Sequence, residues 1–304
     1  MLDGVRRYST ADADIIFQNL RKKVKRNKEV EKLCRGITDD WAREYVQTLD
    51  LTDEQIQYIL NLENATGYNC SVADLQVVAA SLFSNNMEPA FVAGMLGNMC
   101  HEGDVGHLEN VNAGTNNKYE YWNDINKCSV PREDGGDPYT YKNDFADKYL
   151  YDVDFDVYKK LVEQAKNDNP NGDNAIGCGC AQWTQRGRHD LLMSYYEAAD
   201  AEGDHNGQLS YEECLIAETL CMGYELTHNY TDENKNWYSY KTQVTEKWTD
   251  DWKEDGAIIN TAESASDAAE IICDKYENPD PNNSHIDERK ADAESLFNVM
   301  IGED

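Results

Sequence analysis

The sequence predicts a mostly α fold that contains one small extended element and is preceded by a short helical module. Apolar residues recur at helical spacing in most segments of the 304-residue chain. The chain also lacks the alternation of strands and helices that builds a parallel sheet. The extended element is expected near Gly177, where glycines alternate with other residues.

Residues 1–68 form the N-terminal module in this prediction. Thr52 and Gln55 have the spacing of a capping box at a helix start. An earlier helix is indicated by an apolar stripe, which consists of Ile15, Ile16, Leu20 and Val24. Residues 21–28 concentrate Lys and Arg, which favours docking on an acidic wall polymer or on a virion or tail partner. A solvated helix face explains the same cluster.

Residues 69–304 form the second domain. Ser71 caps one of its helices, and Pro89 opens the next. The apolar stripe of that next helix consists of Phe91, Val92, Met95, Leu96 and Met99. Gly94 and Gly97 on the same helix permit close approach of a neighbouring backbone.

The chain between residues 104 and 175 is rich in Asn, Asp and Gly, and we expect it to be largely irregular. Its many aromatic residues suit stacking on sugar faces, although packing explains them equally well. Helical spacing returns after Tyr211. The apolar positions there are Leu215, Ile216, Leu220 and Leu226, then Ala268, Ile271, Ile272 and Tyr276, and finally Leu296 and Val299.

Glu102 ends the helix that Pro89 opens, on the same side as Met95 and Met99. Desolvation and the negative end of the helix dipole both disfavour an ionised carboxylate there. We therefore expect Glu102 to hold its proton toward neutral pH. A carboxylic acid that stays protonated is what cleavage of a glycosidic bond needs.

Residues 177–184 form a second candidate segment. Its two glycines let a ligand approach the backbone, and the amide and indole that follow suit an N-acetylated sugar. The threonine is expected to cap the next helix. The candidate substrate-binding residues are Gly177, Gly179, Gln182, Trp183, Thr184 and Arg188. A tight strand-to-helix turn is the purely structural explanation.

Two segments together resemble the phage tail lysozyme family of the lysozyme superfamily. They are Gly-Asn-Met-Cys-His-Glu-Gly at 97–103 and Gly-Cys-Gly-Cys-Ala-Gln-Trp-Thr at 177–184, followed by Arg188. The C-terminal part has the order of such domains, with segments 224–230, 266–270 and 276–279 and then Arg289. The resemblance covers about residues 71–304 and leaves out the N-terminal module.

The resemblance implies a lysozyme-like α+β fold and cleavage of peptidoglycan between N-acetylmuramic acid and N-acetylglucosamine. It implies that Glu102 is the general acid and that Gln182 and Trp183 line the glycan cleft. The chain departs from the family pattern at two positions. Gly103 stands where the family usually has Ser, which removes a hydroxyl beside the acid, and Cys180 stands where the family has Leu.

Glycoside hydrolysis ordinarily needs a second carboxylate. Asp104, Glu109 and Asp190 are the candidates nearest to the two motifs. Without one in place, the muramyl 6-hydroxyl would attack instead, and the protein would be a lytic transglycosylase. A wall-binding or virion structural protein without turnover is the alternative from a different class. A cysteine amidase is disfavoured because Cys100 and His101 are adjacent, which is rare in a catalytic pair.

Segment 202–213 resembles an EF-hand calcium loop at its Gly, its hydrophobic position, its Ser and its final Glu. The predicted ligands are Glu202, Asp204, Asn206, Gln208 and Glu213, with Asp200 as an alternative first ligand. A polar loop before a helix uses the same residue types as turn and cap residues. Acid catalysis by Glu102 requires no cofactor.

The formal net charge of -30 at pH 7 argues against nucleic acid as a partner, because phosphate is repelled by such a surface. No apolar run has the length of a membrane span, and Met1–Thr10 lacks the apolar region of a signal peptide. We expect action at the bacterial wall, from a phage virion or after release by another route. The nine cysteines, without a CxxC pair, favour reduced and buried thiols.

Overall fold

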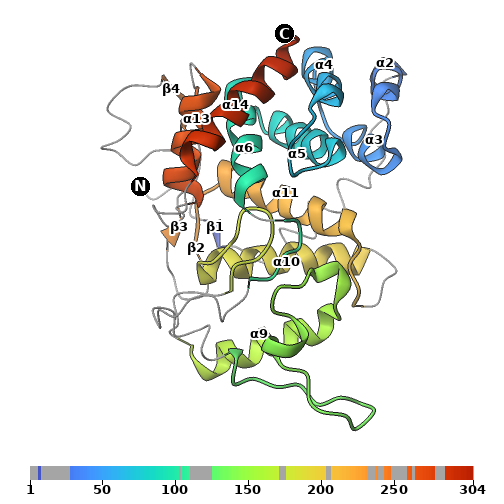
Figure 1. Cartoon of the computed structure of the whole chain (residues 1–304), viewed down its shortest axis with the longest axis vertical. Helices are drawn as coiled ribbons and strands as arrows, with labels where there is room; N and C mark the ends of the chain where they lie inside the picture. Colours follow the sequence, from blue (N-terminus) through green and yellow to red (C-terminus); the bar gives the residue numbers. More distant parts are fainter. Residues whose placement is uncertain are drawn as a thin grey trace. The chain divides into compact units, whose positions relative to one another are not determined.

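The computed structural model confirms that the chain is mostly helical (Figure 1). It describes residues 6–7, 28–102, 104–109, 125–170, 176–202, 207–231, 237–238, 243–247, 259–261, 264–277 and 285–303. The chain divides into two compact units. Unit 1 consists of Met1–Phe17, Gly103–Cys221 and Tyr230–Tyr238, and unit 2 consists of Gln18–Glu102, Met222–Asn229 and Ser239–Asp304.

Unit 2 is built mainly from helices. They are α2 (Lys28–Leu33), α3 (Asp40–Val46), α4 (Asp53–Asn61), α5 (Val72–Ser84), α6 (Pro89–Glu102), α13 (Ala265–Ile271) and α14 (Ile286–Ile301). A π-helical turn at Ile272–Glu277 continues α13. Two short parallel strands, β4 (Gln243–Lys247) and β5 (Ile259–Thr261), belong to the same unit. In Figure 1, α13 and α14 lie against α6.

Local capping sets two helix starts in unit 2. The hydroxyl of Thr52 accepts the N–H of Gln55 at 3.2 Å, and the Gln55 side chain accepts the N–H of Thr52 at 2.9 Å. Ser71 and Asp74 exchange the same pair of hydrogen bonds, at 3.1 and 2.9 Å. Each pair satisfies two backbone donors that the first helical turn leaves unpaired. Both predicted caps are confirmed.

Helix α6 begins at Pro89, as predicted, and every residue of its apolar stripe is buried. A Cβ added at Gly94 would lie 2.7 Å from the Cβ of Ala268 on α13. One added at Gly97 would lie 2.8 Å from the backbone nitrogen of Ala293 on α14. Because real Cβ atoms do not approach so closely, both glycines are needed for this packing. The predicted close approach of neighbouring backbones is confirmed.

Unit 1 contains the longer loops. Its elements are α8 (Tyr141–Asp144), a 3-10 turn at Leu150–Asp152, α9 (Phe155–Asp168), α10 (Arg186–Glu202) and the first part of α11 (Tyr211–Thr227), which continues into unit 2. Three two-residue strands pair in the order β1 (Arg6–Arg7), β2 (Tyr230–Thr231) and β3 (Trp237–Tyr238). A bridge between Leu108 and Cys178 provides the small extended element predicted near Gly177.

Within residues 104–175, where we expected loops together with some helical segments, the described part contains one long helix, α9. Asp154 caps this helix by accepting the N–H of Val157 at 2.9 Å. Its buried residues recur at helical spacing and are Phe155, Val157, Tyr158, Leu161, Val162 and Ala165. The cap and the spacing are both visible in the sequence, but the surrounding Asn- and Asp-rich composition masked them.

The predicted boundary near residue 68 does not coincide with a boundary between compact units. Helices α3 and α4 both contact α5 within unit 2. The division into 1–68 and 69–304 therefore stays a prediction. The apolar stripe of Ile15 to Val24 lies outside the described residues, as do the side chains of the basic cluster at 21–28.

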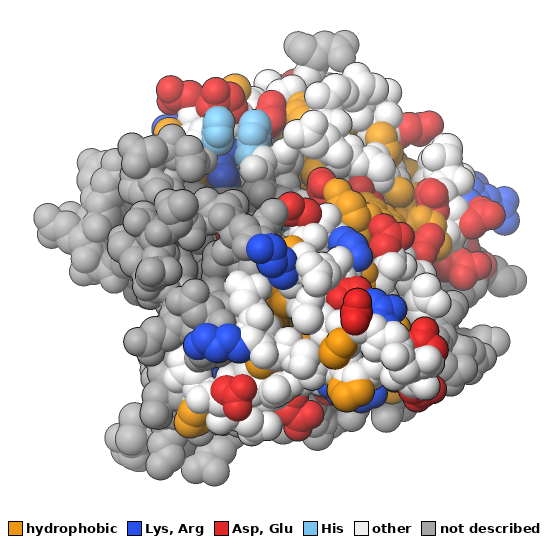
Figure 2. Space-filling view, turned by 60° about the horizontal axis from the view of Figure 1, so that its bottom comes forward, with side chains coloured by type: hydrophobic (Ala, Val, Ile, Leu, Met, Phe, Trp, Pro, Cys, Tyr) orange, Lys and Arg blue, Asp and Glu red, His pale blue; other side chains and the backbone are white. Residues whose placement is uncertain are grey.

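On the face shown in Figure 2, the Lys and Arg side chains of the described residues lie scattered among Asp and Glu and form no single basic patch. Among the described helices, none has the length and apolar character needed to cross a membrane.

Candidate active site

Helix α6 ends at Glu102, where the sequence predicts the general acid. The backbone of Glu102 is described, whereas its side chain lies outside the described residues. Its protonation therefore stays a prediction. The surroundings of the helix that carries it are described in detail.

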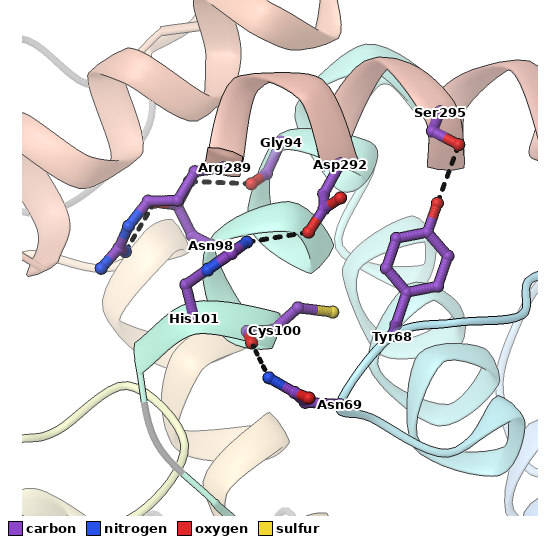
Figure 3. Close-up of polar contacts among 9 residues, drawn as sticks. All are labelled: Tyr68, Asn69, Gly94, Asn98, Cys100, His101, Arg289, Asp292 and Ser295. Carbon is purple, nitrogen blue, oxygen red and sulfur yellow. Dashed lines mark hydrogen bonds and ion pairs between the residues drawn. The ribbon is translucent and has the colours of Figure 1, made fainter. Parts of the chain in front are cut away.

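A buried polar network holds the middle of α6 (Figure 3). The Asn98 amide nitrogen donates to the carbonyl of Gly94 at 2.9 Å. It also donates to the carbonyl of Ala269 on α13 at 3.0 Å. The Asn98 amide oxygen accepts from the guanidinium of Arg289 on α14 at 3.0 Å. Arg289 also forms a buried ion pair with Glu277 of the π-helical turn. The Asn98 side chain of α6 is thus bonded directly to α13 and α14, and through Arg289 it is linked to the π-helical turn.

The last turn of α6 has its own anchors (Figure 3). The Asn69 amide donates to the carbonyl of Cys100 at 3.3 Å, which satisfies one of the carbonyls left unpaired at a helix end. The His101 Nε2 lies 2.8 Å from the Oδ2 of Asp292 on α14. The hydroxyl of Tyr68 donates to Ser295 of α14 at 2.9 Å. The contacts of Cys100 and His101 fix the helix end that bears Glu102 within unit 2, while the Tyr68 hydrogen bond ties the segment before α5 to α14.

The C-terminal segments that carry the family resemblance have structural roles in unit 2. The Tyr276 hydroxyl donates to the buried carboxylate of Glu225 at 2.7 Å. Lys290 pairs with Glu270 at 2.7 Å. Together with Glu277 and Arg289, these residues tie α13, α14 and the end of α11 into the unit that contains α6.

In unit 1, the extended segment 107–109 lies between two neighbouring backbone segments. On one side, the N–H of Leu108 donates to Lys148 at 2.8 Å. On the other side, the N–H of Glu109 donates to Gly177 at 2.9 Å, and the N–H of Gly179 donates to His107 at 2.9 Å. The arrangement brings Glu109 beside the glycine-rich segment, 68 residues later in the sequence.

Glu109 is the candidate second carboxylate with the most perturbed environment. Its Oε2 accepts the N–H of Gly177 at 3.3 Å. Burial raises the pKa of Glu109 from its ordinary value of 4.5 to about 7, against the lowering effect of that hydrogen bond. The negative charge of Asp147 raises the pKa further. Glu109 therefore changes between its protonated and its ionised form near neutral pH.

Gly177 and Gln182 complete the surroundings of Glu109. A Cβ added at Gly177 would lie 2.5 Å from Oε2 of Glu109 and 2.5 Å from Oε1 of Gln182, so a larger residue there would require both side chains to shift. Gln182 has a positive φ of 45°, which is uncommon for a residue with a side chain. Its amide nitrogen donates to the carbonyl of Gly179 at 3.0 Å.

Glu218 of α11 binds the two loops that contain Gly106 and Cys180, and it was not among the residues predicted from the sequence. It is fully buried. Its carboxylate accepts from the N–H of Gly106 at 2.6 Å, the N–H of Cys180 at 2.7 Å and the hydroxyl of Tyr196 at 2.6 Å. Burial raises the pKa of Glu218, and the three donors oppose that effect. The sequence signal for the role of Glu218 was its place on the apolar face of a predicted helix.

The other two acid candidates lie in different settings. Asp104 is exposed and accepts from the hydroxyl of Tyr149 at 2.9 Å. Asp190 pairs with Lys166 at 3.1 Å. Burial alone would raise the pKa of Asp190, but the His189 hydrogen bond and the Lys166 charge outweigh burial and lower it. The roles of Asp104, Glu109 and Asp190 in catalysis stay predictions.

The remaining substrate-binding candidates differ in exposure. Trp183 is fully buried, and Arg188 is 4% exposed, so both belong to the core of unit 1. Thr184 is half-buried. Helix α10 begins at Arg186, so Arg186 and Arg188 lie in its first turn, as predicted. Roles of Trp183, Thr184 and Arg188 in binding sugar stay predictions.

The predicted calcium loop is only partly described. The Glu202 side chain, Asp204 and Asn206 lie outside the described residues, and Gln208 is exposed. The Glu213 carboxylate accepts the N–H of Ser210 at 2.8 Å, and the N–H of Glu213 donates to the Ser210 hydroxyl at 3.2 Å, so the two residues form a capping box at the start of α11. Among the described residues, no group of three His, Cys, Asp or Glu side chains is suited to a metal. Calcium binding stays a prediction, which a thermal melt with calcium against chelator tests.

The alternative Asp200 is described, and its Oδ1 accepts the N–H of Gly207 at 2.9 Å.

The cysteines are free thiols, and all except the half-exposed Cys70 are buried, as predicted. Burial raises the pKa of Cys178 and of Cys214, which keeps both thiols protonated and argues against a thiolate nucleophile at these positions.

Comparisons with known proteins give one match. The family model described as phage tail lysozyme matches residues 74–300. No curated protein and no solved structure matches the chain. The match covers α6, the glycine-rich segment and the C-terminal helices, and it begins after α4.

Proposed function

We propose a function from the premise that this chain belongs to the phage tail lysozyme family, whose model matches residues 74–300. The chain is accordingly a lysozyme-like, peptidoglycan-lytic protein. Our proposal is that it hydrolyses the bond between N-acetylmuramic acid and N-acetylglucosamine. The observation that carries the proposal is Glu102 at the end of α6, inside the matched range and on a helix with several anchors.

In this proposal Glu102 is the general acid. It donates its proton to the glycosidic oxygen as the bond to the anomeric carbon breaks. The negative end of the α6 dipole supports this role, because it disfavours ionisation of a carboxyl at the last residue of the helix. The hydrogen bonds of Asn69 and His101 support it by holding the last turn in place.

Glu109 is proposed as the general base. In its ionised form a carboxylate removes a proton from the water molecule that attacks the anomeric carbon. A pKa of about 7 suits this task, since a base is most effective when its pKa lies near the working pH. In this proposal the half-buried side-chain amide of Gln182 hydrogen-bonds an N-acetyl group of the sugar.

Substitution of each acid tests the proposal. Glu102→Gln and Glu109→Gln are expected to lose clearing of purified cell walls while they still bind the walls. Glu133→Gln, at an exposed glutamate of unit 1, is the matched control and is expected to keep full activity. Unchanged clearing by Glu102→Gln would remove Glu102 from the mechanism, and unchanged clearing by Glu109→Gln would reassign the base.

Mass analysis of the digested wall identifies the reaction. Hydrolysis is expected to leave reducing N-acetylmuramic acid ends. Anhydro ends would instead identify a lytic transglycosylase, and free stem peptides an amidase. A wild-type protein that binds walls without releasing any product would be a structural wall-binding protein. For the site of action we propose a phage virion, with residues 1–68 as its attachment module, or release at lysis.

A further inference from the structure

Four aromatic side chains form a continuous row in unit 1, apart from the residues given catalytic roles. We call His107, Tyr149, Tyr151 and Tyr211 the aromatic row. Neighbouring ring centroids are 5.6, 5.1 and 5.4 Å apart along this order. All four side chains remain half-exposed although they contact one another. A row of rings that is open to water commonly marks a binding surface.

Backbone hydrogen bonds connect the aromatic row to Glu109, Gly177 and Gln182, which we call the Glu109 cluster. His107 and Tyr149 face each other across an antiparallel bridge, and Leu150 donates its N–H to Gly106 at 2.8 Å. The carbonyl of His107 accepts the N–H of Gly179 at 2.9 Å. The row is therefore attached to the same three-segment arrangement that positions Glu109 beside Gly177.

The row also carries polar groups along its length. The hydroxyl of Tyr149 donates to the exposed carboxylate of Asp104 at 2.9 Å, and that contact raises the pKa of Tyr149. The hydroxyls, the imidazole and the carboxylate can hydrogen-bond hydroxyl groups, while the ring surfaces attract C–H groups. Sugar rings display both kinds of group, whereas a phosphate polymer would be repelled by the overall negative charge.

We infer that the aromatic row is a carbohydrate-binding subsite that holds sugars of the peptidoglycan strand next to the Glu109 cluster. The inference rests on the proposed function for the identity of the sugar polymer. The row would act by keeping a long strand in place during cleavage. It would contribute to binding of the strand and leave the bond-breaking step unchanged.

The test uses glycan strands prepared from cell walls by removal of their stem peptides. Tyr149→Ala and Tyr151→Ala are each expected to raise Kd and KM for these strands about three- to tenfold, because one aromatic contact contributes on that scale. The kcat is expected to stay at the wild-type value. Tyr151→Phe keeps the ring and loses only the hydroxyl, so it is expected to weaken binding less than Tyr151→Ala.

Tyr139→Ala is the matched control. Tyr139 is another half-exposed tyrosine of unit 1, but its ring packs on Arg132 with the guanidinium 3.8 Å from the ring centroid, outside the aromatic row. If the Tyr149 and Tyr151 variants bind strands as tightly as this control, the subsite is refuted. A variant that loses its native melting transition is replaced by Tyr149→Leu, which keeps apolar volume and removes the aromatic ring.

The two proposals can fail separately. If the wild type binds strands through the row but releases no product, the hydrolase proposal fails and the subsite stands. If the wild type releases product and the row variants keep the wild-type Kd and KM, the subsite fails and the hydrolase proposal stands.

Discussion

Replacement of Glu109 by Gln is expected to change how stability depends on pH. In the folded chain the pKa of Glu109 is raised from 4.5 to about 7, chiefly by burial. Below pH 4.5 the folded and unfolded chains both carry the proton, so the wild type has the full stability of a neutral carboxyl there. As the pH rises toward 7, only the folded chain retains the proton, and the free energy of unfolding falls.

The size of the effect follows from the difference between the two pKa values. One pKa unit corresponds to about 1.4 kcal/mol, and water screens the half-exposed part of the carboxyl, so we expect the wild type to lose about 2–3 kcal/mol over this range. Glu109→Gln cannot ionise and keeps an oxygen that accepts the N–H of Gly177. Relative to this variant, the free energy of unfolding of the wild type should fall between pH 4.5 and about 7. Above pH 7 the difference in free energy of unfolding between the two proteins should stay constant.

Urea unfolding of both proteins at several pH values between 4 and 8 measures this difference. Glu133→Gln is the control, because Glu133 is exposed and has no such environment. If the free energy of unfolding of the wild type changed with pH in the same way as that of Glu109→Gln, the raised pKa of Glu109 would be refuted. The clearing rate supplies a second readout, since a general base must be ionised. Activity should therefore fall as the pH drops below about 7.

Three further substitutions test the packing around the candidate site, each by urea unfolding. Glu218→Gln replaces an acceptor by an NH₂ that faces a backbone N–H, so a loss of about 1–3 kcal/mol is expected, and wild-type stability would contradict the three hydrogen bonds. Gly94→Ala should cost about 1–3 kcal/mol by overpacking against Ala268, while Gly136→Ala, at an exposed position, should cost much less. Arg289→Met should cost about 3–5 kcal/mol by leaving Glu277 buried without its partner, and adding Glu277→Leu should restore much of the loss.

The sequence was sufficient where the signal is local. The caps at Thr52 and Ser71 and the start of α6 at Pro89 each depend on residues within one helical turn. The glycines at 94 and 97 could be interpreted because an apolar stripe surrounded them on a predicted helix. Helix α9 shows the limit of composition as a guide, since its cap and spacing were present but lay in a polar segment.

The site depended on contacts between distant parts of the chain. Glu109 was one of three acids near the motifs, and only its contact with Gly177 distinguishes it from Asp104 and Asp190. The role of Glu218 could not be predicted from the sequence, because its hydrogen-bond donors come from residues 106, 180 and 196. Periodicity assigns such a residue to a buried helix face but cannot identify the donors that make its burial tolerable.

The C-terminal motifs that carry the family resemblance help to pack the helices of unit 2. Glu277 and Arg289 form a buried ion pair, and Arg289 reaches Asn98 in the middle of α6. A buried pair of this kind adds little net stability but strongly penalises the loss of one partner, so it specifies one packing of α14 on α6. Variants in these motifs should therefore lower stability, whereas Glu102→Gln should lower turnover in a folded protein.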